Sequence, residues 1–105
     1  MSETDPLLLE RTALGNRLLA YVLGLTATAQ LRNPLSEAAT ERLEVLRAVL
    51  TPLLEVDAPQ TIQAWLMGSG MPGGEAPARA IREEGAAAAS EVHAAASRWL
   101  SGGYS

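Results

Sequence analysis

Cysteine, lysine and phenylalanine are absent from this chain of 105 residues, and histidine occurs once, as His93. Without cysteine the chain has no disulfides, no thiolate metal ligands and no cysteine nucleophile. Large rings are few, since the aromatic side chains are Tyr21, Trp65, Trp99 and Tyr104 in a composition that is 48% hydrophobic. A core of this kind is built mainly from aliphatic and alanine side chains, which favours closely packed helices.

An excess of basic charge is also absent. The net charge is −4, with eight basic residues, all arginine, against twelve acids. Because phosphate contacts carry most non-specific nucleic-acid affinity, an acidic chain is a poor general partner for nucleic acid. No run of about 18 apolar residues exists, and the start, "MSETDP", lacks the basic region of a signal peptide. We therefore expect a cytoplasmic protein that does not contact membranes.

The apolar residues follow helical spacing, and no segment alternates long enough to predict a strand. The clearest amphipathic stripe is Ala39, Leu43, Leu46 and Leu50, widened by Val49. We expect an all-α fold, a small bundle of about five helices in one domain over residues 1–105. The predicted helices cover residues 7–25, 27–32, 37–51, 59–67, 77–84 and 86–100.

Three starts of these helices carry local signals. Asp5 and Pro6 form an N-cap acid followed by proline in the first turn, and Asp57 and Pro59 repeat this signal. Ser36 is a good N-cap for the amphipathic helix that follows it. We therefore predict helix starts close to these three positions.

Glycine and proline predict where helices break. Gly15 and Gly24 weaken the first helical segment, and a break at either is compatible with the pattern. Pro52 lacks a backbone N–H and is expected to kink or end the amphipathic helix near Thr51.

The stretch GSGMPG, residues 68–73, has the G-x-G-x-x-G spacing of a dinucleotide-binding turn. That fingerprint requires a buried strand before it, a helix after it and an acid about 20 residues on. The preceding "TIQAWLM" is helical in pattern, so the strand is missing. We interpret the stretch as a flexible connection between two helices and expect no bound cofactor.

His93 offers no metal site, because its neighbours one helical turn away are Ala89 and Ser97. No residue is singled out as the partner of a Ser–His–Asp arrangement. We interpret His93 as a surface or interface residue, and we expect neither metal binding nor enzyme activity.

Residues 18–43 are compatible with a degenerate helix-turn-helix. We therefore divide the domain into a helix-turn-helix-like segment, residues 1–39, and a second part, residues 40–105. Its second helix would need polar groups for base contacts and flanking basic groups. Arg32 is the one charge in that short stretch. The candidate DNA-binding residues are Thr26, Thr28, Gln30, Arg32 and Asn33.

Trp99 and Tyr104 stand near the end of the chain, beside Gly102 and Gly103. Two interpretations stay open. Aromatic side chains on a mobile tail are frequent anchors for a partner protein; alternatively, Trp99 packs on the bundle and Tyr104 is disordered. The apolar stripes of residues 7–25 and 39–50 exceed what a thin core needs, which predicts a homodimer.

The order of residues in the second half resembles a known family. Trp65-Leu66 is followed by Gly73-Gly74, then Pro77, Ile81, Gly85 and Val92, and the segment 41–56 precedes them as a long helix. Over residues 40–105 this order resembles the toxin-binding domain of the Xre/MbcA/ParS-type antitoxins. Ala76 stands where that family often has a serine or threonine cap, so we expect the helix after it to lack a side-chain cap.

The resemblance implies an antitoxin whose partner is a RES-domain toxin, an enzyme that consumes NAD. Family members place their C-terminal residues in or over the NAD pocket of the toxin, and their glycine loop reverses the chain so that two helices share one surface. The implied toxin-binding residues are Trp99, Leu100, Gly102, Gly103, Tyr104 and Ser105, supported by Trp65 and Pro77. Two other functions remain open: a DNA-binding repressor or co-repressor of its own operon, and a stand-alone dimerising helical module.

Overall fold

The computed structural model describes residues 7–32 and 34–103. Within these ranges the chain is helical and contains no strand, which confirms the all-α prediction. The α-helices are α1 (Leu8–Leu14), α2 (Asn16–Val22), α3 (Glu37–Val56), α4 (Pro59–Met67), α5 (Pro77–Glu84) and α6 (Ala89–Arg98). Three short 3₁₀ helices, η1 (Thr28–Arg32), η2 (Pro72–Gly74) and η3 (Gly85–Ala88), and one π-helical turn, η4 (Trp99–Gly103), complete the described part.

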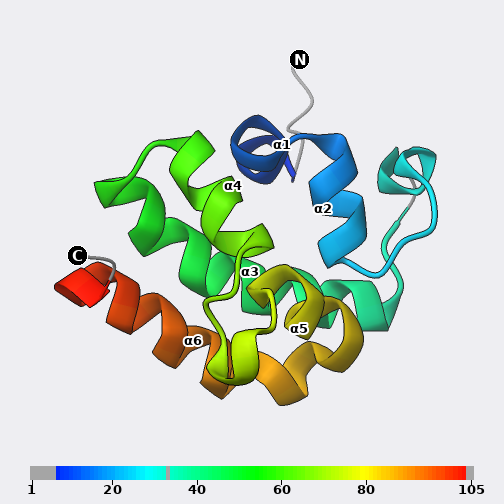
Figure 1. Ribbon diagram of the computed structural model, residues 1–105. Coiled ribbons are helices and arrows are strands. Elements are labelled where there is room, and N and C mark those ends of the chain that lie inside the picture. The colour runs from blue at the N-terminus through cyan, green and yellow to red at the C-terminus, as the bar shows by residue number, and fades with distance from the viewer. Residues whose placement is uncertain (1–6, 33, 104–105) are drawn as a thin grey trace.

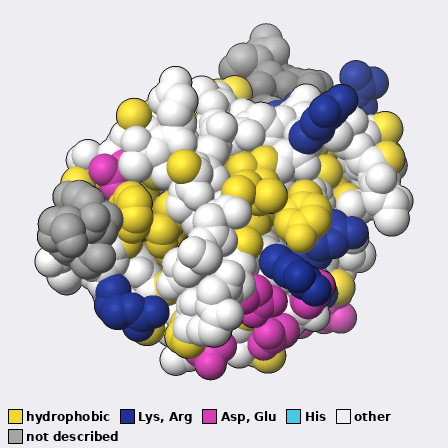
Figure 2. Space-filling model, in the orientation of Figure 1, with side chains coloured by type: hydrophobic (Ala, Val, Ile, Leu, Met, Phe, Trp, Pro, Cys, Tyr) yellow, Lys and Arg dark blue, Asp and Glu magenta, His cyan; other side chains and the backbone are white. Residues whose placement is uncertain are grey.

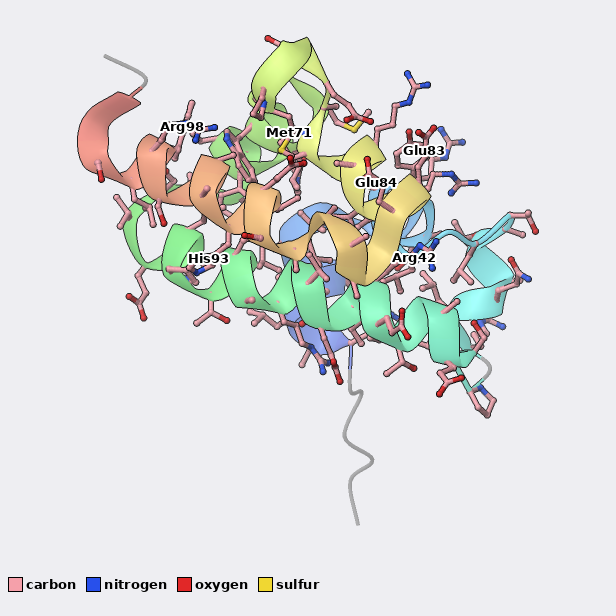
Figure 3. All side chains as sticks on the ribbon, turned by 90° about the horizontal axis from the view of Figure 1, so that it is seen from below. Arg42, Met71, Glu83, Glu84, His93 and Arg98 are labelled. Atoms are coloured by element: carbon pink, nitrogen blue, oxygen red, sulfur yellow. The ribbon has the colours of Figure 1, made fainter. Side chains whose placement is uncertain are left out.

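The centre of the bundle is α3, the longest helix, with 20 residues. Figure 1 shows it running through the middle of the molecule, and α2, α4, α5 and α6 all contact it. Figure 3 shows α6 lying alongside it. The predicted stripe is confirmed, because its members are all buried: Ala39, Leu43, Leu46, Val49 and Leu50. Each fully buried leucine contributes about 1.5–3 kcal/mol to the free energy of folding.

Helix α3 does not end near Thr51, so the alternative in which Pro52 ends the helix there is wrong. It continues through Pro52 to Val56. Proline removes one backbone hydrogen bond, to the carbonyl of Ala48. Ala48 and Thr51 are exposed, so this side of the helix faces water, which can satisfy that carbonyl. On the other side Leu53 is buried against the core, and its burial offsets the lost bond.

The first predicted helix is divided at Gly15. This residue has a φ of 83°, a left-handed conformation that glycine adopts without a steric penalty, and it separates α1 from α2. Gly24, with a φ of 81°, follows the end of α2. Both breaks that the sequence left open are therefore present. The predicted start at Asp5 and Pro6 lies outside the described residues.

Two arginines fasten the ends of helices to each other. The Arg42 side chain donates from Nε to the carbonyl of Arg82 at 2.8 Å and from Nη1 to the carbonyl of Ala38 at 3.0 Å. Arg82 Nη1 in turn donates to the carbonyls of Tyr21, at 2.7 Å, and Leu25, at 3.3 Å. Arg82 and Tyr21 lie in the last turns of α5 and α2, where carbonyls lack partners within the helix, and a guanidinium there satisfies both the hydrogen bonding and the helix dipole. The pair therefore connects α2, α3 and α5.

No helix within residues 7–32 and 34–103 combines the length and the apolar character that crossing a membrane requires.

Candidate functional site

A groove of about 410 Å³ lies between α4, the glycine loop (residues 68–74) and the C-terminal end of α6. Figure 3 places Arg98 of α6 and Met71 of the loop on the same side of the molecule. The groove is lined by Thr61, Ala64 and Trp65 from α4, by Gly68, Ser69 and Gly70 from the loop, and by Ala95, Arg98 and Trp99 from the end of α6. A concave, largely apolar surface with a few polar groups at its rim is typical of a binding site.

The glycine loop is seated on the indole of Trp65, which is 5% exposed. A Cβ atom at Gly70 would lie 3.0 Å from Trp65 Nε1 and 3.7 Å from Pro77 Cγ. Because real Cβ atoms seldom approach so closely, glycine lets the backbone cross the edge of the ring. Trp65 and Pro77, two residues of the antitoxin-like order, therefore both lie next to Gly70. The interpretation of Trp65 as a core residue is confirmed.

Two further features hold the loop. Met71 is buried, its N–H donates to the carbonyl of Glu75 at 3.0 Å, and its carbonyl accepts from Gly74 at 2.9 Å. Gly73 and Gly74 have φ values of 85° and 84°, which side-chain-bearing residues rarely adopt. The predicted connection between two helices is confirmed, since α4 and α5 pack together after the turn. The anchoring by Met71 was not predicted, although a lone large apolar residue among glycines is the local signal for it.

Trp99 packs on the bundle. Its side chain is half-buried, and its indole Nε1 donates to Asp57 Oδ2 at 2.8 Å. Leu100 beside it is also half-buried against the core. Of the two interpretations of Trp99, packing on the bundle matches the structure. Gly102 and Gly103 lie in the π-helical turn η4, and Tyr104 and Ser105 lie outside the described residues.

Asp57 does not cap α4, so this prediction is wrong. The N-cap is Ala58, which makes no side-chain cap hydrogen bond, and Pro59 occupies the first turn. The carboxylate of Asp57 accepts from Trp99 instead, a residue 42 positions away in the sequence. Sequence reasoning missed this role because no local pattern signals a contact of that separation. At the start of α5 the expectation is confirmed: Ala76 is the N-cap and provides no side-chain hydrogen bond.

The candidate DNA-binding segment forms a turn instead of a recognition helix. The predicted helix over 27–32 is present as η1, a 3₁₀ helix of five residues. The side-chain oxygen of Gln30 accepts from the backbone N–H groups of Thr26 and Ala27, at 2.8 and 3.0 Å, and from the Thr26 hydroxyl at 3.1 Å. Gln30 therefore caps its own turn. A helix-turn-helix requires a recognition α-helix long enough to enter the major groove, and the described residues 26–32 form no α-helix.

Two of the remaining candidate DNA-binding residues, Thr28 and Arg32, lie on η1 and line the same pocket. Thr28 and Arg32 are exposed on η1, and Asn33 lies outside the described residues. His93 is exposed on α6, as the sequence predicts. Within residues 7–32 and 34–103, no group of three or more His, Asp or Glu side chains is placed to hold a metal ion.

The chain matches no family model, and no curated protein or solved structure is similar to it. A function is therefore inferred from the groove and from the order of the residues around it.

Proposed function

We propose that this chain is an antitoxin that neutralises a RES-domain, NAD-consuming toxin by placing its C-terminal segment over the active site of the toxin. The observation that carries the proposal is the convergence of Trp65, Gly70 and Trp99 on one groove. The antitoxin-like residue order marks the same three segments: the Trp-Leu pair, the glycine loop and the C-terminal helix.

The groove has the composition of a protein interface. Tryptophan and arginine are enriched where binding energy concentrates, and Trp99 and Arg98 lie side by side along its lining. Arg98 is exposed and makes no hydrogen bond or ion pair with the described residues, so its charge is available to a partner. Full burial of a large apolar side chain contributes about 1.5–3 kcal/mol, and burying the remaining exposed part of Trp99 contributes a fraction of that.

The hydrogen bond from Trp99 to Asp57 prepares this surface for binding. It fixes the position of the indole before a partner arrives. Ordering a mobile side chain on association costs about 0.5–1.5 kcal/mol. A side chain that is already ordered avoids most of this cost. In the proposed complex, Trp99 and Leu100 act as the rigid base from which residues 101–105 extend over the toxin.

Truncation after Arg98 tests the proposal. The truncated chain lacks Trp99 and the residues beyond it but keeps the helices α1 to α6. We expect the full chain to restore growth and the cellular NAD level in cells that express a RES-domain toxin, and the truncated chain to fail. Full protection by the truncated chain would exclude the C-terminal segment as the inhibitor. A RES-domain gene next to the gene for this chain is the natural choice of toxin.

A DNA-binding repressor of its own operon is the second candidate. The exposed side chains of Thr28, Arg32 and Arg17 around η1 favour it, and the absence of a recognition α-helix in the described residues weighs against it. A gel-shift experiment with the upstream operon DNA, with and without the toxin, discriminates. No shift in either mixture removes this candidate.

A stand-alone dimerising helical module is the third candidate. Leu8 and Leu9 on α1 are 61% and 52% exposed, which leaves apolar surface for a second copy. Sedimentation equilibrium over a range of protein concentrations tests the homodimer. A monomer at all concentrations would exclude it.

A further inference from the structure

A second pocket of about 410 Å³ lies on a different part of the molecule, between the end of α2, the residues leading into η1, and α5. Its polar and charged lining consists of Arg17, Tyr21, Thr26, Thr28 and Arg82. No acidic residue lines it, although acids outnumber arginines by twelve to eight in the chain. The local charge is therefore opposite to the charge of the whole molecule.

Arg82 is held in a fixed orientation in this pocket. Its Nη1 donates to the carbonyls of Tyr21 and Leu25, and its guanidinium carbon lies 4.7 Å from the centroid of the Tyr21 ring. These contacts occupy one of the three guanidinium nitrogens. Nε and Nη2 donate to none of the described residues, so they remain available to a ligand. A half-buried guanidinium that is already oriented loses little side-chain entropy when it binds.

Arg17 adds a second positive charge to the same pocket. It precedes Tyr21 by four residues on α2, so the two side chains share a helix face. Arg17 is exposed and makes no hydrogen bond or ion pair with the residues that the structure describes. Glu83, which follows Arg82 in the sequence, is paired with Arg79 at 2.9 Å. Figure 2 shows arginine side chains on both sides of the hydrophobic surface between α2 and α5.

We propose that this pocket binds a phosphate monoester. Two guanidinium groups with free donors match the geometry and charge of a phosphate, which arginine binds through paired N–H groups. The hydroxyl of Thr28 supplies a further donor at the pocket wall. The volume exceeds what a phosphate ion needs and falls in the range of small-molecule sites. The surplus is lined by Tyr21 and Leu25, which suit an apolar or aromatic organic group.

Titration of the full-length protein with inorganic phosphate and with phenyl phosphate, followed by amide chemical shifts, tests the proposal. We expect shifts confined to the end of α2, η1 and α5, and tighter binding of phenyl phosphate than of inorganic phosphate. Arg17→Gln, at an exposed position without contacts, should weaken binding by about tenfold or more, since hydrogen bonds between charged groups are strong. Arg98→Gln is the matched control. Figure 3 shows Arg98 at the opposite end of the molecule from Glu83, the neighbour of Arg82.

Three results would overturn the proposal. Equal weakening by Arg17→Gln and Arg98→Gln would show general ionic attraction. Equal affinity for inorganic phosphate and phenyl phosphate would show that the pocket holds the anion alone. Binding of short duplex DNA through Arg17, without binding of either small phosphate, would assign the surface to a nucleic-acid backbone. Melting curves of each variant establish that it is folded before its affinity is compared.

Discussion

The part of the chain from α4 to α6 and the part from α1 to η1 are stabilised in different ways. In the first, a tight glycine loop sits on a buried tryptophan, and contacts between residues close in sequence determine the path of this loop. In the second, two helices of seven residues each are too short to be stable alone, and side chains from distant segments fasten them. Arg82 holds the end of α2, and Gln63 Nε2 of α4 donates to the carbonyl of Ala13 in α1 at 2.7 Å.

The comparison explains why the two candidate sites differ in character. The groove beside Trp65 is apolar and rests on packing, whereas the pocket beside Arg82 is basic and rests on hydrogen bonds. Variants in the first region should therefore act mainly on the free energy of unfolding through lost packing. Variants in the second region should act by removing side-chain donors, which leaves backbone carbonyls at the helix ends without a hydrogen bond.

Trp65→Ala is expected to have the largest effect. It removes a side chain that is 5% exposed and that supports both the groove and the glycine loop. Replacing a buried tryptophan by alanine costs about 3–5 kcal/mol in the free energy of unfolding. Urea denaturation followed by far-UV circular dichroism measures the change. A loss as small as that of an exposed substitution would show that the loop does not depend on the indole.

Arg82→Ala is expected to have the next largest effect. It removes the donor for the carbonyls of Tyr21 and Leu25 and the contact with the Tyr21 ring. Loss of a charged donor to partly buried carbonyls costs about 1.5–3 kcal/mol. Amide hydrogen exchange in α2 should accelerate more than exchange in α6.

Arg79→Ala is the matched control for Arg82→Ala. Arg79 lies on the same helix, and its exposed side chain pairs with Glu83 at the next turn. Exposed pairs of this kind contribute little to stability. The pairing with Glu83 raises the pKa of Arg79 above its ordinary value, so the charge of Arg79 is constant across the accessible pH range. If both variants are equally destabilised, the fastening of α2 by Arg82 is not specific.

The sequence predicts this fold well where the signals are local. The amphipathic stripe of α3, the break at Gly15 and the uncapped start at Ala76 follow from residues near one another. The interactions it could not predict join distant segments. Asp57 accepts from Trp99, and Glu10, 2% exposed, accepts from Arg47 Nε at 2.8 Å across 37 positions. A charged residue on an apparently exposed face carries no local sign that a partner from another helix will cover it.

Two glycines distinguish a steric requirement from a conformational one. At Gly70→Ala the new Cβ meets the Trp65 ring at 3.0 Å, whereas at Gly15→Ala it meets nothing within 4 Å but must adopt a φ of 83°. Each is expected to cost about 1–2 kcal/mol, the first by overpacking and the second by backbone strain. Trp65→Phe replaces the indole by a smaller ring. Adding it should reduce the destabilisation caused by Gly70→Ala and leave that caused by Gly15→Ala unchanged. Thermal unfolding of the four variants measures this, and equal relief at both glycines would contradict the distinction.

Apart from the control Arg79→Ala, Asp57→Ala is expected to have the smallest effect on stability, because Trp99 is only half-buried. Loss of the hydrogen bond from the indole costs about 1 kcal/mol. Asp57→Asn is the matched control, because its side-chain oxygen can still accept from Trp99 Nε1 without the negative charge. Asp57→Ala should shift tryptophan fluorescence to longer wavelength and increase its quenching by acrylamide, while Asp57→Asn leaves both close to those of the unmodified chain.

If Asp57→Asn behaves like Asp57→Ala, the carboxylate charge holds Trp99 in place, and the contact stabilises the groove electrostatically. If neither variant changes the fluorescence, packing against the hydrophobic core alone orders the indole, and the preparation of the groove for a partner does not depend on Asp57.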